Sequence, residues 1–146
     1  MANWKYNAIQ DLQEYPSIKD SLVSIPEEIK AIEIDMQVVK GVSYDKTPVS
    51  GGASGREDRL IDYIDRKGRL QENYKAAELR VRRIERGLNC LTEKERKVLE
   101  RFFINREYGH IDRLCDDLGY EKSAVYKLKD TALKKFTLSM FGVVDL

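Results

Sequence analysis

The stretch LCDDLGYEKSAVYKLKDTALKKF, residues 114–136, decides the fold because its spacing describes two short helices joined by a sharp turn. Apolar positions mark one edge of the first helix, and Gly119 ends it; these positions are Leu114, Cys115 and Leu118. A second helix is predicted by apolar residues at steps of three, four and four, at Val125, Leu128, Ala132 and Phe136. Two helices with a glycine turn and a basic outer face are the helix-turn-helix pattern that reads DNA.

The outer face of the second helix predicts the residues that contact DNA. On a helical wheel the base-facing positions at its N-terminal end are Lys122, Ser123, Tyr126 and Lys127. Lysine donates to guanine, serine bonds a base or a phosphate, and tyrosine contacts phosphate or a thymine methyl. Phosphate contacts are predicted for Arg96, Arg101, Lys134 and Lys135. The alternative is an ordinary solvated helix face.

The positive charge is concentrated in the C-terminal half of the chain, which favours DNA binding. Residues 80–137 hold 15 basic and 10 acidic side chains, a net charge of +5, although the whole chain carries only +1. The basic half is the half with the helix-turn-helix pattern, as binding to phosphate requires. A row of arginines just before it (Arg80, Arg82, Arg83 and Arg86) either grips phosphates or forms a solvated helix flank.

Composition favours an all-α protein in the cytoplasm. Charged residues make up 35% and hydrophobic residues 42% of the 146 residues, without the alternation typical of strands. The apolar runs are too short to span a membrane, and the N-terminus lacks the apolar core of a signal peptide. Cys90 and Cys115 are expected to be buried free thiols, and His110 an exposed capping residue. We expect no metal, no cofactor and no enzymatic activity.

The N-terminal region, residues 1–40, is predicted to contain short helices. Trp4, Ala8, Leu12 and Tyr15 give helical steps, and Pro16 is expected to end that helix. Ser24 and Glu27 resemble a capping box that starts another helix, to about residue 40. Residues 41–55, with four glycines, are predicted to be a flexible linker.

A long helix is predicted over residues 56–89, after a capping box at Ser54 and Glu57. Its apolar seam alternates steps of four and three, at Leu70, Tyr74, Ala77, Val81, Ile84 and Leu88. A helix of this length needs a partner for its seam. Two partners remain open: a second copy of the chain in a homodimer, or residues 26–40 folded back as a hairpin.

Residues 90–146 are predicted to form a three-helix domain, which begins with a capping box at Thr92 and Glu95. LTEKERKVLERFF followed by DRLCDDLGYEKSAVYKLKDTALKKF resembles the fourth conserved region of bacterial sigma factors. The matching positions include Leu118-Gly119, Val125 and Ala132–Phe136. The match assigns the same base-facing residues as the wheel does. Glu121 departs from the pattern, because the family usually has Ser or Thr there.

The order of the segments is similar to that of phage regulators of the ArpU/RinA type, which activate late genes in phages of Gram-positive bacteria. That resemblance implies double-stranded DNA and RNA polymerase as partners, in the cytoplasm of the bacterial host. Two alternatives fit the same architecture. One is a small DNA-recognition subunit of a phage packaging machine, and the other is a helical adaptor that binds RNA polymerase without reading DNA.

Overall fold

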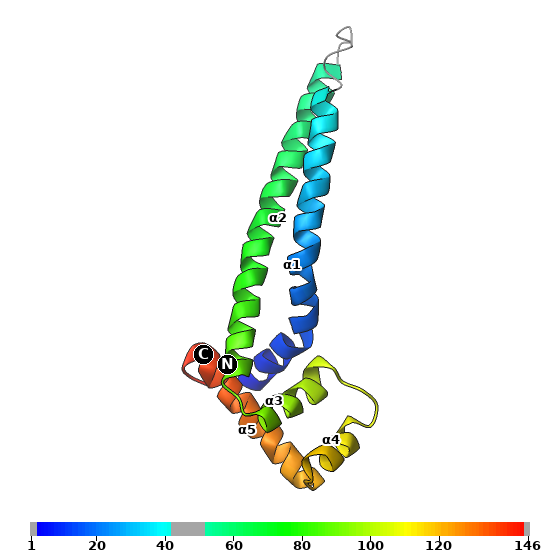
Figure 1. The fold of residues 1–146 in the computed structure, drawn as a ribbon. Helices are drawn as coiled ribbons and strands as arrows, with labels where there is room; N and C mark the ends of the chain where they lie inside the picture. Colours follow the sequence, from blue (N-terminus) through cyan, green and yellow to red (C-terminus); the bar gives the residue numbers. More distant parts are fainter. Residues whose placement is uncertain (1–2, 42–51, 145–146) are drawn as a thin grey trace. The chain divides into compact units, whose positions relative to one another are not determined.

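The chain is all-helical in the computed structural model, which describes residues 3–41 and 52–144. No strand occurs among these residues, so the predicted fold class is confirmed. The helices are α1 (Trp4–Gly41), α2 (Gly52–Asn89), α3 (Glu93–Leu99), α4 (His110–Leu118) and α5 (Lys122–Phe141), with a π-helical turn η2 (Glu100–Ile104) after α3 (Figure 1). None of the helices in the described residues has an apolar stretch that would reach across a bilayer.

Helix α1 corrects the prediction for the N-terminal region, because it runs without a break through Pro16 and Pro26. A proline inside a helix removes one backbone hydrogen bond and costs about 3 kcal/mol. Burial of Leu12 before Pro16 and of Ile32 after Pro26 favours a helix that continues past both prolines. The predicted capping box at Ser24 is therefore wrong. The Ser24 hydroxyl donates instead to the carbonyl of Asp20 at 3.3 Å, within the helix.

Helix α2 begins at Gly52, so Ser54 lies inside the helix and the capping box predicted there is wrong. The C-terminal part of the predicted linker, residues 52–55, is helical. Residues 42–51 of that linker lie outside the described residues. The end of α2 at Asn89 agrees with the predicted end of the long helix.

The chain divides into two compact units, and both α1 and α2 contribute to each. The larger unit consists of residues up to 19 and from 79 onward, and the hairpin unit consists of residues 20–78. This division differs from the predicted domains 1–40, 56–89 and 90–146. It arises because the N-terminal end of α1 packs with α5 and the C-terminal end of α2: Ala8 and Leu12 share a buried cluster with Ile84, Leu133 and Phe136.

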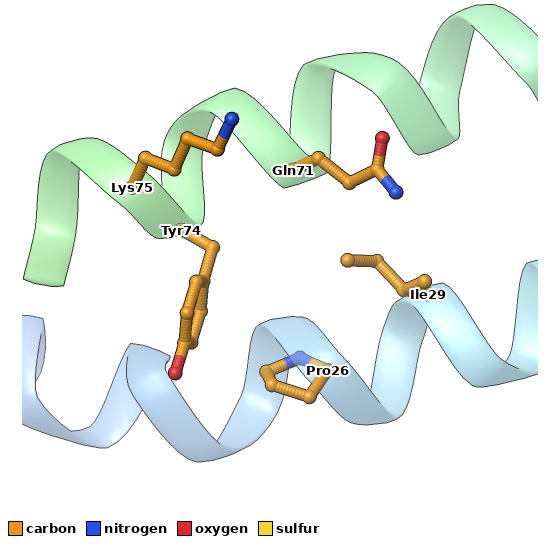
Figure 2. A pocket seen from close by; sticks show the side chains of 5 residues that line it. All are labelled: Pro26, Ile29, Gln71, Tyr74 and Lys75. Carbon is orange, nitrogen blue, oxygen red and sulfur yellow. The ribbon is translucent and has the colours of Figure 1, made fainter.

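In the hairpin unit, α1 and α2 lie side by side (Figure 1). A salt bridge joins Lys67 to Glu33 at 3.4 Å. Pro26 and Ile29 of α1 face Tyr74 of α2 across a pocket of about 430 Å³, which Gln71 and Lys75 also line (Figure 2). A hairpin within one chain was one of the two arrangements that the sequence left open.

The seam of α2 packs most tightly in the larger unit. Val81, Ile84 and Leu88 are buried there, whereas Leu70, Tyr74 and Ala77 in the hairpin unit are only half-buried. Arg80, one of the arginines considered for phosphate, pairs instead with Asp11 at 2.9 Å and Glu14 at 2.7 Å. These bonds tie α2 to α1 within the larger unit.

Candidate nucleic-acid interface

The turn between α4 and α5 has the geometry that the sequence predicts. Gly119 ends α4 with φ of 70°, a backbone conformation that side chains with a Cβ rarely adopt. Its N–H donates to the carbonyl of Cys115 at 2.9 Å, and the N–H of Tyr120 donates to the same carbonyl at 3.2 Å. Glu121 is extended and precedes the first residue of α5, without a capping bond from its side chain. Two helices separated by three residues therefore form a helix-turn-helix.

A small apolar cluster fixes the angle between these helices. Val98, Phe102, Leu114 and Val125 are its buried members, and they come from α3, η2, α4 and α5. Leu118 and Leu128 pack against it from the two helices of the motif. Val125 is fully buried, so the side of α5 on which it lies is held against the domain.

The four predicted base-facing residues lie together at the exposed N-terminal end of α5. Lys122, Ser123, Tyr126 and Lys127 are all exposed, within the first two turns of the helix. Neither Lys122 nor Lys127 has an ion-pair partner in the described part of the chain. The structure thus brings together two free ammonium groups, a hydroxyl and a phenol on one surface.

Tyr126 is held in place by its neighbours, although 41% of it is exposed. Its ring meets the edge of Phe102 with 5.8 Å between ring centroids. The Nζ of Lys129 lies 5.2 Å from the centroid of Tyr126 and 5.5 Å from that of Phe102, which are cation–π distances. Sequence reasoning missed Lys129. Its position three residues after Tyr126 on the same helix was the available signal.

Of the four residues predicted to contact phosphate, three bond to other groups of the protein. The Nε of Arg96 donates to the carbonyl of Leu88 at 3.3 Å, and Arg101 pairs with Asp117 at 3.6 Å. Lys135 pairs with Glu95 at 2.9 Å. Lys134 is exposed and has no ion pair within the described residues. Three of the four side chains therefore hold the domain together, and Lys134 is the one that is open to solvent without a partner.

Glu95 connects the start of α3 to α5. It accepts from the N–H of Thr92 at 3.0 Å while its own N–H donates to the Thr92 hydroxyl at 3.2 Å, which confirms the predicted capping box. Burial alone would raise the pKa of Glu95. Hydrogen bonds from Lys135 and Thr92 outweigh burial and hold the pKa below its ordinary value of 4.5. Glu95 is therefore a charged, almost fully buried carboxylate that fixes Lys135.

Two predictions about single residues are corrected. His110 is the first residue of α4 and is buried, because its ring packs edge-on against Phe102 at 4.9 Å. Both cysteines are free, but Cys90 is exposed and Cys115 is half-buried. The described residues contain no group of three side chains suited to a metal ion.

Comparisons with models of protein families, with curated proteins and with solved structures gave no match to this chain.

Proposed function

We propose that the protein is a sequence-specific regulator of transcription that binds double-stranded DNA through α5. The observation that carries the proposal is the exposed set Lys122, Ser123, Tyr126 and Lys127 at the N-terminal end of the second helix of a helix-turn-helix. In such motifs the N-terminal residues of the second helix contact base edges in the major groove. The excess of basic residues in the same half of the chain supports attraction to phosphate.

Under this proposal, the residues at the N-terminal end of α5 contact bases, and Lys134 further along the helix contacts a phosphate. The ammonium groups of Lys122 and Lys127 are free to donate to guanine O6 or N7, and the Ser123 hydroxyl bonds a base or a phosphate. Tyr126 is pre-positioned by Phe102 and Lys129, so little side-chain freedom is lost when it contacts a thymine methyl. Lys134 lies two turns beyond Lys127, where it holds a flanking phosphate.

The resemblance to sigma-factor region four and to ArpU/RinA-type regulators supports a role in phage or prophage late-gene activation, inside the bacterial host. RNA polymerase is the second partner under this proposal. The mechanism is one of binding, in which the protein marks a promoter and recruits the polymerase without a catalytic step.

DNA binding is tested by fluorescence anisotropy with duplexes selected from a random pool. Lys127→Ala should weaken binding to the preferred site by about 1–3 kcal/mol and relax the sequence preference, because it removes a base contact. Lys134→Ala should weaken all duplexes alike and flatten the slope of log affinity against log salt by about one unit. Lys75→Ala, which removes an exposed lysine from the hairpin unit, is the matched control and should change neither quantity. Wild-type affinity of Lys127→Ala for the preferred site would show that the recognition face is misassigned.

The regulatory role is tested by transcription from a phage late promoter, with and without the protein. We expect more transcript when the protein is present and no increase with Lys127→Ala. An unchanged transcript level together with binding to a packaging ATPase would favour a packaging subunit. Activation that survives the loss of DNA binding would favour an adaptor of RNA polymerase.

A further inference from the structure

A hollow lies at the N-terminal end of α4, where the loop from η2 enters the helix (Figure 1). It has a volume of about 420 Å³, a size that is common among ligand-binding pockets. Its lining consists of five consecutive residues: Arg106, Glu107, Tyr108, Gly109 and His110. All five belong to the larger unit, as do both helices of the helix-turn-helix. The hollow is therefore built within one unit, beside the proposed DNA-binding motif.

His110 is a buried polar side chain without a hydrogen bond to any described residue. It is 8% exposed, and its ring packs edge-on against Phe102. In the described part of the chain, every fully covered side-chain nitrogen or oxygen has a hydrogen-bond partner. Since the ring nitrogens of His110 have none, they are not fully covered, and they open into the hollow that His110 lines. The hollow thus contains a polar group with unused capacity for a hydrogen bond.

The start of α4 adds donors from the backbone. Its cap residue is Gly109, which has no side chain that could accept from the first turn. The N–H of His110 donates to the carbonyl of Glu107 at 3.1 Å. The next two N–H groups, of Ile111 and Asp112, have no acceptor among residues 3–41 and 52–144. Free N–H groups at the start of a helix favour an anion, and the helix dipole adds to this preference.

The charges around the hollow also favour an anion. Arg106 is exposed and has no ion pair within the residues that the structure describes. The carboxylate of Glu107 is paired with Arg113, so its charge is balanced. Asp112 lies in the first turn of α4 but does not line the hollow. Among the lining residues, Arg106 therefore supplies a positive charge that no described side chain offsets.

Ring contacts connect the hollow to the proposed recognition surface. Phe102 lies between His110 and Tyr126, with centroid distances of 4.9 Å to the first ring and 5.8 Å to the second. His110 and Tyr126 are therefore no farther apart than these two distances together. The major groove of DNA is about 12 Å wide. When Tyr126 contacts a base in that groove, the hollow lies within reach of the backbone at the edge of the groove.

From the unused donors of His110 and α4, the unpaired Arg106 and the short distance to Tyr126, we propose that the hollow binds one phosphate group of the DNA backbone. Arginine and tyrosine side chains and helix N-termini are frequent donors to phosphate in protein–DNA complexes. Tyr108, which is fully exposed, supplies a phenol beside Arg106. None of the four phosphate contacts predicted from sequence lines the hollow. The contact belongs to the same DNA complex and so rests on the proposed function.

Two variants remove donors from the hollow. Arg106→Gln removes the charge, and His110→Phe removes the ring nitrogens but keeps a ring against Phe102. In anisotropy titrations with the selected duplex, Arg106→Gln should weaken binding roughly five- to tenfold at about 0.1 M salt and flatten the slope of log affinity against log salt by about one unit, because one phosphate contact is lost. Arg69→Gln is the matched control, because it removes an exposed arginine from the hairpin unit, and it should change neither quantity. Circular dichroism checks that the variants remain folded.

Replacing single phosphates of the duplex by neutral methylphosphonates locates the contact. The wild-type protein should lose affinity at one phosphate where Arg106→Gln and His110→Phe lose no more, because both changes remove the same interaction. That phosphate should flank the base pair whose preference Tyr126→Ala relaxes. If the losses from the protein variants and from the methylphosphonates added up at every phosphate, the proposal would be overturned.

Nuclear magnetic resonance distinguishes a DNA phosphate from a free anion. His110 is the only histidine of the chain, so its ring signals are identified directly. They should shift when the selected duplex is added, and should not shift when the duplex carries the methylphosphonate at the located position. Inorganic phosphate at the same phosphate concentration should leave them unchanged. Signals that shift with inorganic phosphate but not with the duplex would reveal a site for a free anion and overturn the proposal.

Two results separate this contact from the proposed function. If Arg106→Gln and His110→Phe bind the selected duplex as tightly as the wild-type protein while Lys127→Ala does not, the hollow holds no phosphate although α5 still contacts DNA. If the wild-type protein binds no duplex, the proposed function and the phosphate contact are both overturned.

Discussion

The substitution Gly87→Ala tests how closely α2 and α5 pack in the larger unit. Helix α2 comes close to α5 at Gly87, where an added Cβ would lie 2.7 Å from Cδ2 and 2.8 Å from Cε2 of Phe136. Phe136 is fully buried, so its ring cannot move into solvent. Gly87→Ala therefore forces a shift of packed atoms.

The net effect is the difference between two terms. Overpacking a core by one methyl group costs about 1–3 kcal/mol. Replacing a glycine by alanine within a helix returns about 1 kcal/mol. We expect Gly87→Ala to lower the free energy of unfolding by about 1 kcal/mol. Gly68→Ala is the control on the same helix, because no atom lies within 4 Å of an added Cβ there, and it should gain about 1 kcal/mol in the hairpin unit.

Urea unfolding measures both variants. Trp4, the single tryptophan, packs against the buried cluster of the larger unit, so its fluorescence reports on Gly87→Ala. Circular dichroism follows the helices of both units. With a slope of about 2 kcal/mol per M, the fluorescence midpoint of Gly87→Ala should fall by roughly 0.5 M. A fluorescence midpoint that rises for Gly87→Ala would refute the close approach of α2 and α5.

Further substitutions test the remaining contacts. Thr92→Ala should cost about 1 kcal/mol in urea unfolding, because it removes the cap of α3, and Thr92→Ser should retain most of the stability. Hydrogen bonds lower the pKa of Glu95 in the folded state, so its charged carboxylate stabilises the fold above pH 4.5, and this stabilisation is lost as the pH falls through the lowered pKa. Acid titration of Glu95→Gln should therefore show a smaller loss of folding stability than the wild-type protein over the same acidic range. Leu114→Ala should cost about 2–5 kcal/mol, measured by thermal unfolding, because Leu114 is fully buried between α4 and α5. Arg80→Gln should cost less than about 1 kcal/mol, and the cost should shrink in high salt, because the ion pairs with Asp11 and Glu14 are partly exposed.

The features that could be predicted from sequence depend on residues close together in the chain. Gly119 ends α4 and Thr92 caps α3 through bonds that span only a few residues. The same local spacing at Ser24 and Ser54 predicted helix starts that do not occur, because α1 and α2 each begin earlier in the chain. Local rules failed at Pro16 and Pro26. Both carry the usual signal for a helix boundary, but α1 continues through both prolines, with Leu12 buried before Pro16 and Ile32 buried after Pro26. The division into units also depends on packing between distant segments, since Leu12 and Phe136 belong to one buried cluster.

At the candidate site, too, local sequence patterns predicted some features and not the contacts between distant elements. The helical period alone indicated which residues of α5 face outward, and Val125 is buried as that period requires. The partners of the basic residues were not predictable, because they come from other elements. Asp117 of α4 pairs with Arg101, and Glu95 of α3 pairs with Lys135. A cationic side chain in the sequence is equally suited to a phosphate and to a carboxylate of its own domain, and only the folded arrangement distinguishes the two.

Selection of bound duplexes from a random DNA pool is the decisive test of sequence-specific binding through α5. The wild-type protein should enrich one short motif, and a variant with Tyr126→Ala and Lys127→Ala should bind DNA weakly and enrich no motif. Both proteins should have the same helical content, because Val125 and Leu128, through which α5 packs on the domain, are unchanged. A pool that stays random with the wild-type protein, or the same motif enriched by the double variant, would show that α5 does not read DNA sequence.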